Sequence, residues 1–220
     1  MSISKKRRNL GFLTDANVSY SSPYFLLLLT LTLMPYMKIF KDRKSAGQIL
    51  AERLKDAKAD LVLGIPRGGV VVAAEIAKLL KIPLDIIVTR KIGAPGQPEL
   101  ALGALDPDGE VVWEEELIEE LGARVGDLGD EVQKQWKELK RREDLYRGDR
   151  GDPKIEGKTI ILVDDGMATG ATVLAAVRYL KRHGALVILG IPVASKDAVD
   201  RVIREIGETG KIITLSTPED

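Results

Sequence analysis

Two adjacent carboxylates stand directly before a glycine- and threonine-containing turn in the second half of the chain. Asp164 and Asp165 follow the apolar run at residues 160–163, and residues 168–172 then lead into a helical pattern. The first turn of a helix offers unpaired N–H groups and a partial positive charge, which suit a phosphate group. Paired carboxylates readily accept hydrogen bonds from the two hydroxyls of a diol. The spacing therefore predicts a site for a 5-phosphorylated ribose.

The turn contains residue types that would strengthen this phosphate site. Gly170 has no Cβ and would let the backbone approach a phosphate closely, while Thr169 and Thr172 would add hydroxyl donors. The simpler alternative is a strand-to-helix turn whose acids only cap the helix. A Walker-type nucleotide loop is disfavoured because no Gly-Lys-Ser or Gly-Lys-Thr accompanies the turn.

A second candidate anion-binding segment lies upstream. Arg67, Gly68 and Gly69 stand between an apolar run and a helical pattern. The two glycines would expose backbone N–H groups at the helix start, and the guanidinium is a rigid fork that suits phosphate. Taken alone, the segment could also be a simple helix entry.

A third basic segment follows the next apolar run. Arg90 and Lys91 stand where a predicted strand ends. The glycines and prolines of residues 91–99 predict a mobile loop there. Glu99 could anchor this loop or face a substrate. A solvated basic pair is the alternative to an anion-binding role for Arg90 and Lys91.

Hydrophobic periodicity places these segments on alternating strands and helices. The sequence predicts strands at residues 61–66, 84–90, 158–165, 185–193 and 211–216, and helices at 42–54, 68–80, 170–184 and 196–207. This alternation implies an α/β fold with a mostly parallel twisted sheet flanked by helices. Ligands of such sheets bind at the carboxyl ends of strands, where all three segments lie.

The middle of the chain departs from this alternation. Strands at residues 100–105 and 110–113 are joined by Asp-Pro-Asp-Gly, which favours a hairpin. Residues 114–150 are heavily charged and predict two helices. The expected apolar face of the second helix consists of Val132, Trp136 and Leu139. We therefore expect a helical insertion before the strand that carries the two acids, within one domain at residues 37–220.

Composition excludes several classes of function. Lys+Arg and Asp+Glu number 33 each among 220 residues, so no net field would recruit nucleic acid or an anionic membrane. The absence of cysteine excludes disulfides and thiolate chemistry. A single histidine argues against a zinc site or a histidine-based triad.

Residues 1–36 differ in character from the rest of the chain. A basic start at residues 5–8 and an apolar run at residues 25–34 have the order of a signal peptide, whose apolar region needs ~7–15 residues. The run is shorter than the ~20 residues of a membrane-spanning helix, and no small-residue cleavage site comes after it. Because the folded pattern begins at Lys38, we favour Met37 as the natural start, residues 1–36 as an extension, and a cytoplasmic location.

Residues 160–180 resemble the phosphoribosyl pyrophosphate (PRPP) motif of the type I phosphoribosyltransferases. That motif is an apolar strand, two acids, three residues and Thr-Gly-x-Thr, and this sequence matches it throughout. The resemblance implies that Asp164 and Asp165 bind the ribose hydroxyls and that the turn binds the 5-phosphate. The implied PRPP-binding residues of the turn are Gly166, Met167, Ala168, Thr169, Gly170, Ala171 and Thr172.

Residues 38–193 are similar to a branch of this family that combines Pro-Arg-Gly-Gly, Arg-Lys-Ile-Gly-Ala-Pro-Gly and Val-Asp-Asp-Gly-Met-Ala-Thr-Gly-Ala-Thr. The first motif looks like the family's pyrophosphate loop, which often has a strained or cis peptide beside the Arg-Gly step. Lys91, with Arg90 beside it, would reach the pyrophosphate. The implied cofactor is Mg²⁺, which Asp164 and Asp165 would touch through water or the ribose hydroxyls.

The implied activity is transfer of the 5-phosphoribosyl group from PRPP to a nitrogenous base or amine, with release of pyrophosphate. A non-catalytic PRPP- or nucleotide-binding regulator remains an alternative, as does a hydrolytic or phosphotransfer enzyme. Ala168 stands where hypoxanthine-guanine enzymes carry an aspartate, which argues against 6-oxopurine acceptors. The chain ends soon after its last strand, so the hood over the acceptor would come from the N-terminal helix, the insertion or a partner subunit, as in a homodimer.

The insertion of this branch carries an arginine-rich segment. Here it consists of Arg141, Arg142, Glu143, Leu145, Tyr146, Arg147 and Gly148. Arginines beside an aromatic ring could grip phosphate or stack on a base. They could equally be the charged face and end of a helix.

Overall fold

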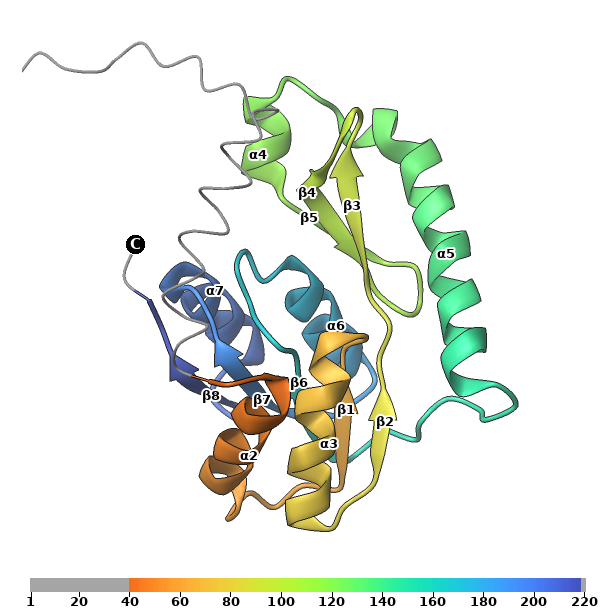
Figure 1. Cartoon of the computed structure of the whole chain (residues 1–220). Coiled ribbons are helices and arrows are strands. Elements are labelled where there is room, and N and C mark those ends of the chain that lie inside the picture. Colours follow the sequence, from red (N-terminus) through yellow and green to blue (C-terminus); the bar gives the residue numbers. More distant parts are fainter. Residues whose placement is uncertain (1–39, 219–220) are drawn as a thin grey trace, which may run out of the picture. The chain divides into compact units, whose positions relative to one another are not determined.

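The computed structural model describes residues 40–218, and a five-stranded parallel sheet forms its centre (Figure 1). The strand order is β2-β1-β6-β7-β8, and every neighbouring pair is parallel. The strands are β1 (Leu61–Gly64), β2 (Leu84–Ile86), β6 (Thr159–Val163), β7 (Leu186–Val193) and β8 (Lys211–Ser216). The mostly parallel α/β fold expected from the sequence is therefore confirmed.

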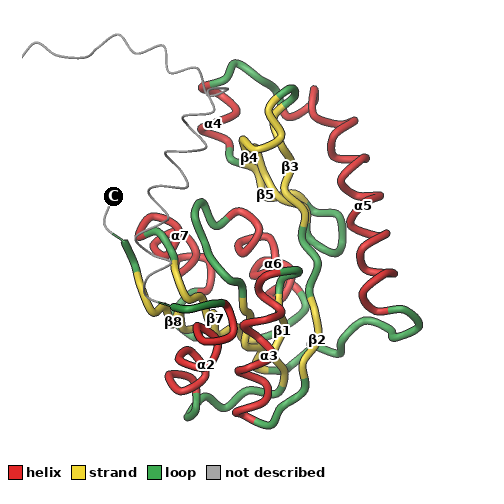
Figure 2. The backbone as a smooth tube through the Cα atoms, viewed as in Figure 1, coloured by secondary structure: helices red, strands yellow, loops and turns green. Residues whose placement is uncertain are grey.

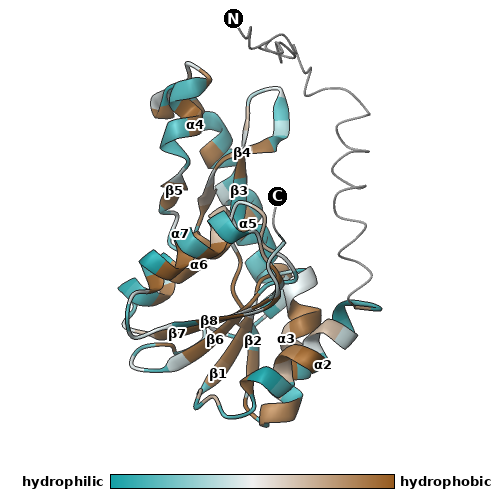
Figure 3. Ribbon diagram, turned by 90° about the vertical axis from the view of Figure 1, so that its left-hand side faces the viewer, coloured by the Kyte–Doolittle hydropathy of each residue, from teal (hydrophilic) through white to brown (hydrophobic). Residues whose placement is uncertain are grey.

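Helices cover both faces of this sheet because both faces of its strands are apolar. In β6, Ile161 and Val163 pack with α2 and α3, whereas Ile160 and Leu162 pack with α6 and α7. The hydropathy colouring shows this continuous apolar sheet between helices with one polar face (Figure 3). The helices are α2 (Arg43–Leu54), α3 (Gly68–Leu80), α6 (Ala171–Arg182) and α7 (Lys196–Ile206).

A second, antiparallel sheet contains the middle of the chain, in the order β3-β4-β5 (Figure 2). Its strands are β3 (Arg90–Ala94), β4 (Gln97–Leu105) and β5 (Val111–Trp113). The predicted hairpin around Asp-Pro-Asp-Gly is confirmed as β4–β5. The predicted strand at residues 84–90 is shorter than expected, because the chain leaves the parallel sheet after Ile86 and enters β3 at Arg90.

The prediction of a mobile loop at residues 91–99 is wrong, since these residues form the β3–β4 hairpin. Pro95 and Gly96 lie between the paired residues Ala94 and Gln97, and Gly96 has a φ of +76°, which suits the third position of a tight turn. At Gly93, a Cβ would lie 2.6 Å from the Pro98 carbonyl oxygen. Glycine and proline here allow a tight turn and a close approach of the two strands.

Three helical segments stand between β5 and β6, where the sequence predicted an insertion: α4 (Glu115–Glu120), the 3-10 helix η2 (Val125–Leu128) and α5 (Gly129–Arg147). The predicted apolar face of α5 is confirmed. Val132, Trp136 and Leu139 pack with Ile92 of β3 and Leu105 of β4. The helix α5 therefore covers one side of the antiparallel sheet (Figure 1).

The antiparallel sheet is attached to α6 through the β4–β5 turn. Asp106 has only 1% of its side chain exposed, and its carboxylate accepts hydrogen bonds from the N–H groups of Asp108 and Glu110. Its other oxygen accepts a 2.7 Å hydrogen bond from Arg182 of α6. A buried carboxylate needs such partners, so this contact fixes the sheet beside α6.

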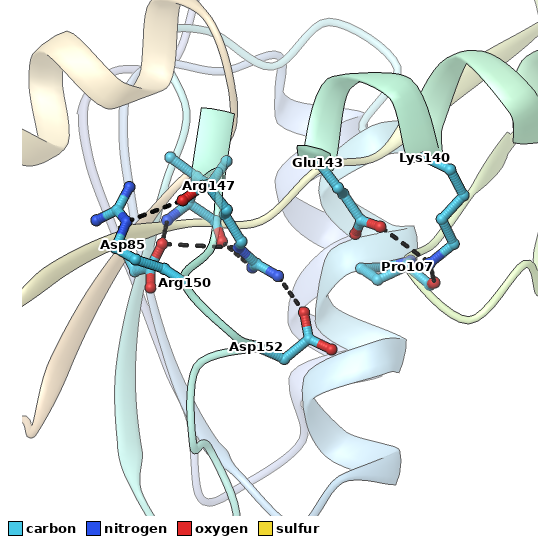
Figure 4. Close-up of polar contacts among 8 residues, drawn as sticks. Asp85, Pro107, Lys140, Glu143, Arg147, Arg150 and Asp152 are labelled. Atoms are coloured by element: carbon cyan, nitrogen blue, oxygen red, sulfur yellow. Dashed lines mark hydrogen bonds and ion pairs between the residues drawn. The ribbon is translucent and has the colours of Figure 1, made fainter. Parts of the chain in front are cut away.

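The arginine-rich end of α5 makes several contacts within the fold (Figure 4). Arg147 has 8% of its side chain exposed, donates a 2.7 Å hydrogen bond to the Ile86 carbonyl oxygen, and forms ion pairs with Asp85 and Asp152. Arg141 and Arg142 both pair with Glu138 of the same helix. These contacts support the charged-face alternative for the cluster.

The expectations for residues 1–36 lie outside the described residues. Within residues 40–218, no helix combines the length and the apolar character that crossing a membrane requires.

Candidate active site

The sheet order brings two predicted loops together. β1 and β6 are parallel neighbours with Gly64 opposite Val163, so the loops that come after them leave the same edge of the sheet. A Cβ on Gly69 would lie 2.6 Å from the Val163 carbonyl oxygen, and one on Gly68 would overlap the Asp165 carboxylate. Only glycine allows α3 to begin this close to the two acids.

The start of α3 also holds a cis peptide bond, between Pro66 and Arg67. This bond lies one step before the Arg-Gly peptide, in the neighbourhood where the resemblance led us to expect one. The Arg67 side chain is exposed and forms no ion pair with any described residue. Arg67 is the residue directly before α3, which begins at Gly68.

The two acids have different surroundings. Asp164 is partly buried, and its Oδ1 accepts a 2.8 Å hydrogen bond from the Asp165 N–H. Burial, followed by the neighbouring carboxyl of Asp165, raises the pKa of Asp164 well above its usual range. Asp165 keeps 30% of its side chain exposed, and its Oδ2 accepts a 2.6 Å charge-assisted hydrogen bond from Nε of Arg43.

Hydrogen bonds to the end of β7 and the start of α7 hold the turn that follows the acids. Met167 donates its N–H to the Val193 carbonyl oxygen at 2.9 Å, and its own carbonyl accepts from the Ser195 N–H at 2.9 Å. The Ser195 hydroxyl donates to the Ala168 carbonyl oxygen at 2.6 Å and accepts from the Ala198 N–H at 3.2 Å. This residue caps α7 and holds the turn at the same time.

The turn ends at Gly170, the residue before α6. Gly170 has a φ of +80°, a left-handed conformation that favours glycine, and Ala171 begins the helix. The unpaired N–H groups of the α6 N-terminus therefore face a pocket of about 180 Å³. The pocket is lined by Lys91, Ala101, Gly166, Met167, Ala168, Thr169, Gly170, Ala171 and Thr172.

Lys91 reaches this pocket from the antiparallel sheet. Its Nζ donates hydrogen bonds to the Glu99 carbonyl oxygen at 3.0 Å and to Glu99 Oε2 at 3.1 Å, both across the β3–β4 hairpin. Glu99 thus anchors Lys91 in the hairpin, one of the two roles left open for it. A cation and a helix N-terminus converge on one small pocket, which is a favourable environment for a phosphate group.

The structure does not bring Arg90 to this pocket, although Arg90 precedes Lys91 in the sequence. Successive side chains of a strand point to opposite faces. Arg90 donates from Nε and Nη2 to Gln135 Oε1 of α5, at 3.0 and 2.6 Å, and lines a different pocket of about 660 Å³ along that helix. Burial there lowers the pKa of Arg90.

Two residues of the site were missed by sequence reasoning. Arg43 stands in a run of charged residues whose pattern predicts an ordinary helix surface, and Ser195 looks like an ordinary helix cap. Each contacts the candidate site across a long stretch of sequence, 122 residues for Arg43 and 27 for Ser195. No local signal marks either contact, so the fold was needed to find them.

A parallel sheet with an anion pocket and a carboxylate pair at one strand end is the architecture of the type I phosphoribosyltransferases. In agreement, the model of the phosphoribosyl transferase domain matches residues 39–205. The chain therefore belongs to the phosphoribosyltransferase family.

Individual relatives support this assignment. The chain is 42% identical over 185 residues to Rv0571c of Mycobacterium tuberculosis, whose name classes it with the phosphoribosyl transferases; the match spans 83% of this chain and 41% of that protein. The structure is similar to that of TT1426 from Thermus thermophilus, with a TM-score of 0.66, 41% identity, and coverage of 82% of this chain and 86% of the other. Adenine phosphoribosyltransferase of Mycobacterium tuberculosis is 28% identical over 149 residues, 67% of this chain and 53% of that enzyme.

The lengths of these relatives differ. The chain spans about two fifths of Rv0571c but most of TT1426. The match leaves more than half of Rv0571c uncovered.

Proposed function

We propose that this chain binds PRPP with Mg²⁺ and transfers its 5-phosphoribosyl group to a nitrogenous base or amine, releasing pyrophosphate in the cytoplasm. The observation that carries the proposal is the pocket at the N-terminus of α6, which Lys91 lines on one side. The acid pair lies between this turn and the end of β6. Membership of the phosphoribosyltransferase family supports the same conclusion. Residues 37–220 would form the transferase domain.

The 5-phosphate would bind in the small pocket. The backbone N–H groups at the start of α6 and the hydroxyls of Thr169 and Thr172 are suitable donors for its oxygens. The ribose hydroxyls would donate to Asp164 and Asp165, which stand at the strand end just before the turn. One turn of chain would thus bind both ends of the ribose 5-phosphate group.

The pyrophosphate would lie toward the start of α3. Arg67 and the N–H groups of Gly68 and Gly69 are the donors on that side. Lys91, which also lines the pocket of the 5-phosphate, would reach the pyrophosphate from the β3–β4 hairpin. Arg90 is bonded to α5, so we leave it out of this set. These groups would stabilise the negative charge that the pyrophosphate gains as its bond to ribose C1 breaks.

The chemical step would be a substitution at ribose C1. The bond from C1 to the pyrophosphate oxygen breaks, its electron pair leaves with the pyrophosphate, and a nitrogen lone pair forms the new bond. Catalysis would depend on holding the ribose 5-phosphate and the leaving group in fixed positions. No side chain in the described site is placed as an evident base toward the acceptor, so the proposal assigns none.

The residues present fit a Mg²⁺ ion that is bound mainly through substrate oxygens. Among the described residues, no group of three or more His, Cys, Asp and Glu side chains could hold a metal, but Asp165 keeps 30% of its side chain exposed. Mg²⁺ favours phosphate oxygens and retained waters over a complete protein cage. When bound, the ion supplies charge neutralisation at the pyrophosphate.

The test is release of pyrophosphate from PRPP in the presence of Mg²⁺ and a panel of purines, pyrimidines and small amines. Turnover with any acceptor, lost in the Asp164→Asn/Asp165→Asn variant, supports the proposal. Asp149→Asn is the matched control, because Asp149 is an exposed acid after α5. PRPP binding without turnover would favour the regulatory alternative, and free ribose 5-phosphate as the product would favour a hydrolase.

A further inference from the structure

Arg43 reaches the candidate active site from a helix that the motifs do not include. It lies in the first turn of α2, and its Nε donates to Asp165 Oδ2 at 2.6 Å. The Arg43 side chain is 61% exposed and that of Asp165 is 30% exposed. An ion pair this open to solvent contributes little to the stability of the fold. We therefore consider a role in ligand binding for Arg43.

The start of α2 is held firmly in place. Asp42 and Ser45 form a capping box, in which the Asp42 carboxylate accepts from the Ser45 N–H at 2.7 Å and the Ser45 hydroxyl accepts from the Asp42 N–H at 3.0 Å. Further along, a Cβ on Gly47 would lie 2.8 Å from the Val72 carbonyl oxygen of α3. The two helices therefore pack closely, and Arg43 stands on a fixed element.

The same carboxylate places Arg43 beside the pyrophosphate end of the site. Asp165 lies directly against Gly68, the first residue of α3, and accepts from Arg43 with its Oδ2. The guanidinium of Arg43 therefore lies, through Asp165, on the side of the site where α3 begins. The small pocket for the 5-phosphate is lined by other residues, and Arg43 is not among them.

The hydrogen-bond geometry leaves one edge of the guanidinium available. Nε is the atom bonded to Asp165, and within residues 40–218 neither Nη1 nor Nη2 of Arg43 has a hydrogen-bond partner. The Nη1–Nη2 edge of arginine is a flat pair of donors that matches two oxygens of one phosphate group. Asp165 orients the side chain and leaves this edge exposed.

We propose that Arg43 binds the pyrophosphate group of PRPP through its Nη1–Nη2 edge, with Asp165 orienting it through Nε. The inference rests on the proposed function and adds an arginine from α2 to the leaving-group side of the site. Asp165 then has two tasks, since it holds Arg43 and accepts from the ribose.

The experiment separates the two halves of PRPP. Binding of Mg²⁺–pyrophosphate alone and of ribose 5-phosphate alone is measured by calorimetry for the wild-type protein, Arg43→Ala, Arg43→Lys and Lys44→Ala. Lys44 is the matched control, because it is the next cation on α2 and is also exposed. Loss of a charge-assisted contact predicts that Arg43→Ala weakens pyrophosphate binding on the order of 10- to 100-fold. Ribose 5-phosphate binding should change by less than about twofold, and Lys44→Ala should change neither.

Arg43→Lys keeps the charge but lacks the flat pair of donors, so it should recover only part of the lost pyrophosphate affinity. Unchanged pyrophosphate binding by Arg43→Ala overturns the inference. So does a loss confined to ribose 5-phosphate, which would make Arg43 a simple counter-ion of Asp165. If the wild-type protein binds both halves and Arg43→Ala binds pyrophosphate equally well, this inference alone is contradicted. Wild-type protein that binds neither half contradicts the proposed function as well.

Discussion

Gly69→Ala tests the close approach of α3 to the strand that carries the acids. A Cβ at this position would lie 2.6 Å from the Val163 carbonyl oxygen and 2.8 Å from the Asp164 Cα, and both are backbone atoms. Ordinary contact begins at 3.4 Å. Because a backbone cannot rotate away as a side chain can, the start of α3 and the end of β6 must move apart by several tenths of an ångström.

The size of the effect depends on two opposing contributions. Overpacking of this kind destabilises a protein by about 1–3 kcal/mol. Replacing glycine by alanine in a helix stabilises it by about 1 kcal/mol. We therefore expect the free energy of unfolding to fall by up to about 2 kcal/mol. PRPP affinity should fall on the order of tenfold, because the N–H groups of α3 move relative to the acids and about 1.4 kcal/mol corresponds to a factor of ten.

Chemical denaturation and calorimetric titration with PRPP measure the two effects. Gly129→Ala is the control: Gly129 is also in the first turn of its helix, α5, and its Cβ would meet nothing within 4 Å. This control should be as stable as the wild-type protein or slightly more so, with unchanged PRPP affinity. If Gly69→Ala behaves like Gly129→Ala in both measurements, α3 does not pack against the acids as described.

Three further substitutions probe other contacts. Ser195→Ala removes the cap of α7 and the hydrogen bond to the Ala168 carbonyl oxygen. The free energy of unfolding should fall by about 1 kcal/mol, and calorimetry should show weaker binding of ribose 5-phosphate. Unchanged ligand affinity would contradict the second expectation. The raised pKa of Asp164 means that the folded state retains its proton longer, so stability should fall as pH rises from the usual carboxyl pKa of 3.8 to the raised one. When melting temperature is recorded against pH, Asp164→Asn should lack that fall. Parallel profiles for the variant and the wild-type protein would refute the raised pKa of Asp164. Arg182→Ala leaves the buried Asp106 without its cation, so urea denaturation should show a loss of about 1–3 kcal/mol, and no loss would mean that this contact does not fix the antiparallel sheet.

The part of the site that could be predicted from sequence is the part built from consecutive residues. The apolar strand β6, the acids Asp164 and Asp165, and the turn into α6 are adjacent in the chain, so residue type and spacing are sufficient to predict them. The helices of the insertion were predicted for the same reason, because their apolar positions recur with a helical period.

The remaining features depend on contacts between distant segments or on the direction of a side chain. Glycine and proline at residues 93–98 favoured a loop, yet they form a hairpin because their backbone conformations suit a tight turn. Arg90 and Lys91 are neighbours in the sequence but face opposite sides of β3. Arg43 contacts Asp165 because α2 packs on α3, and no local sequence pattern indicates that packing.

The most direct test of the central claim is a calorimetric titration of PRPP, with and without Mg²⁺, into the wild-type protein and the Asp164→Asn/Asp165→Asn variant. We predict saturable binding to the wild-type protein that is stronger with Mg²⁺. The variant should bind at least about tenfold more weakly, since each lost hydrogen bond to a charged acceptor is worth about 1.5–3 kcal/mol. Equal binding by the two proteins, or no binding by the wild type, would contradict the assignment of this strand end as the PRPP site.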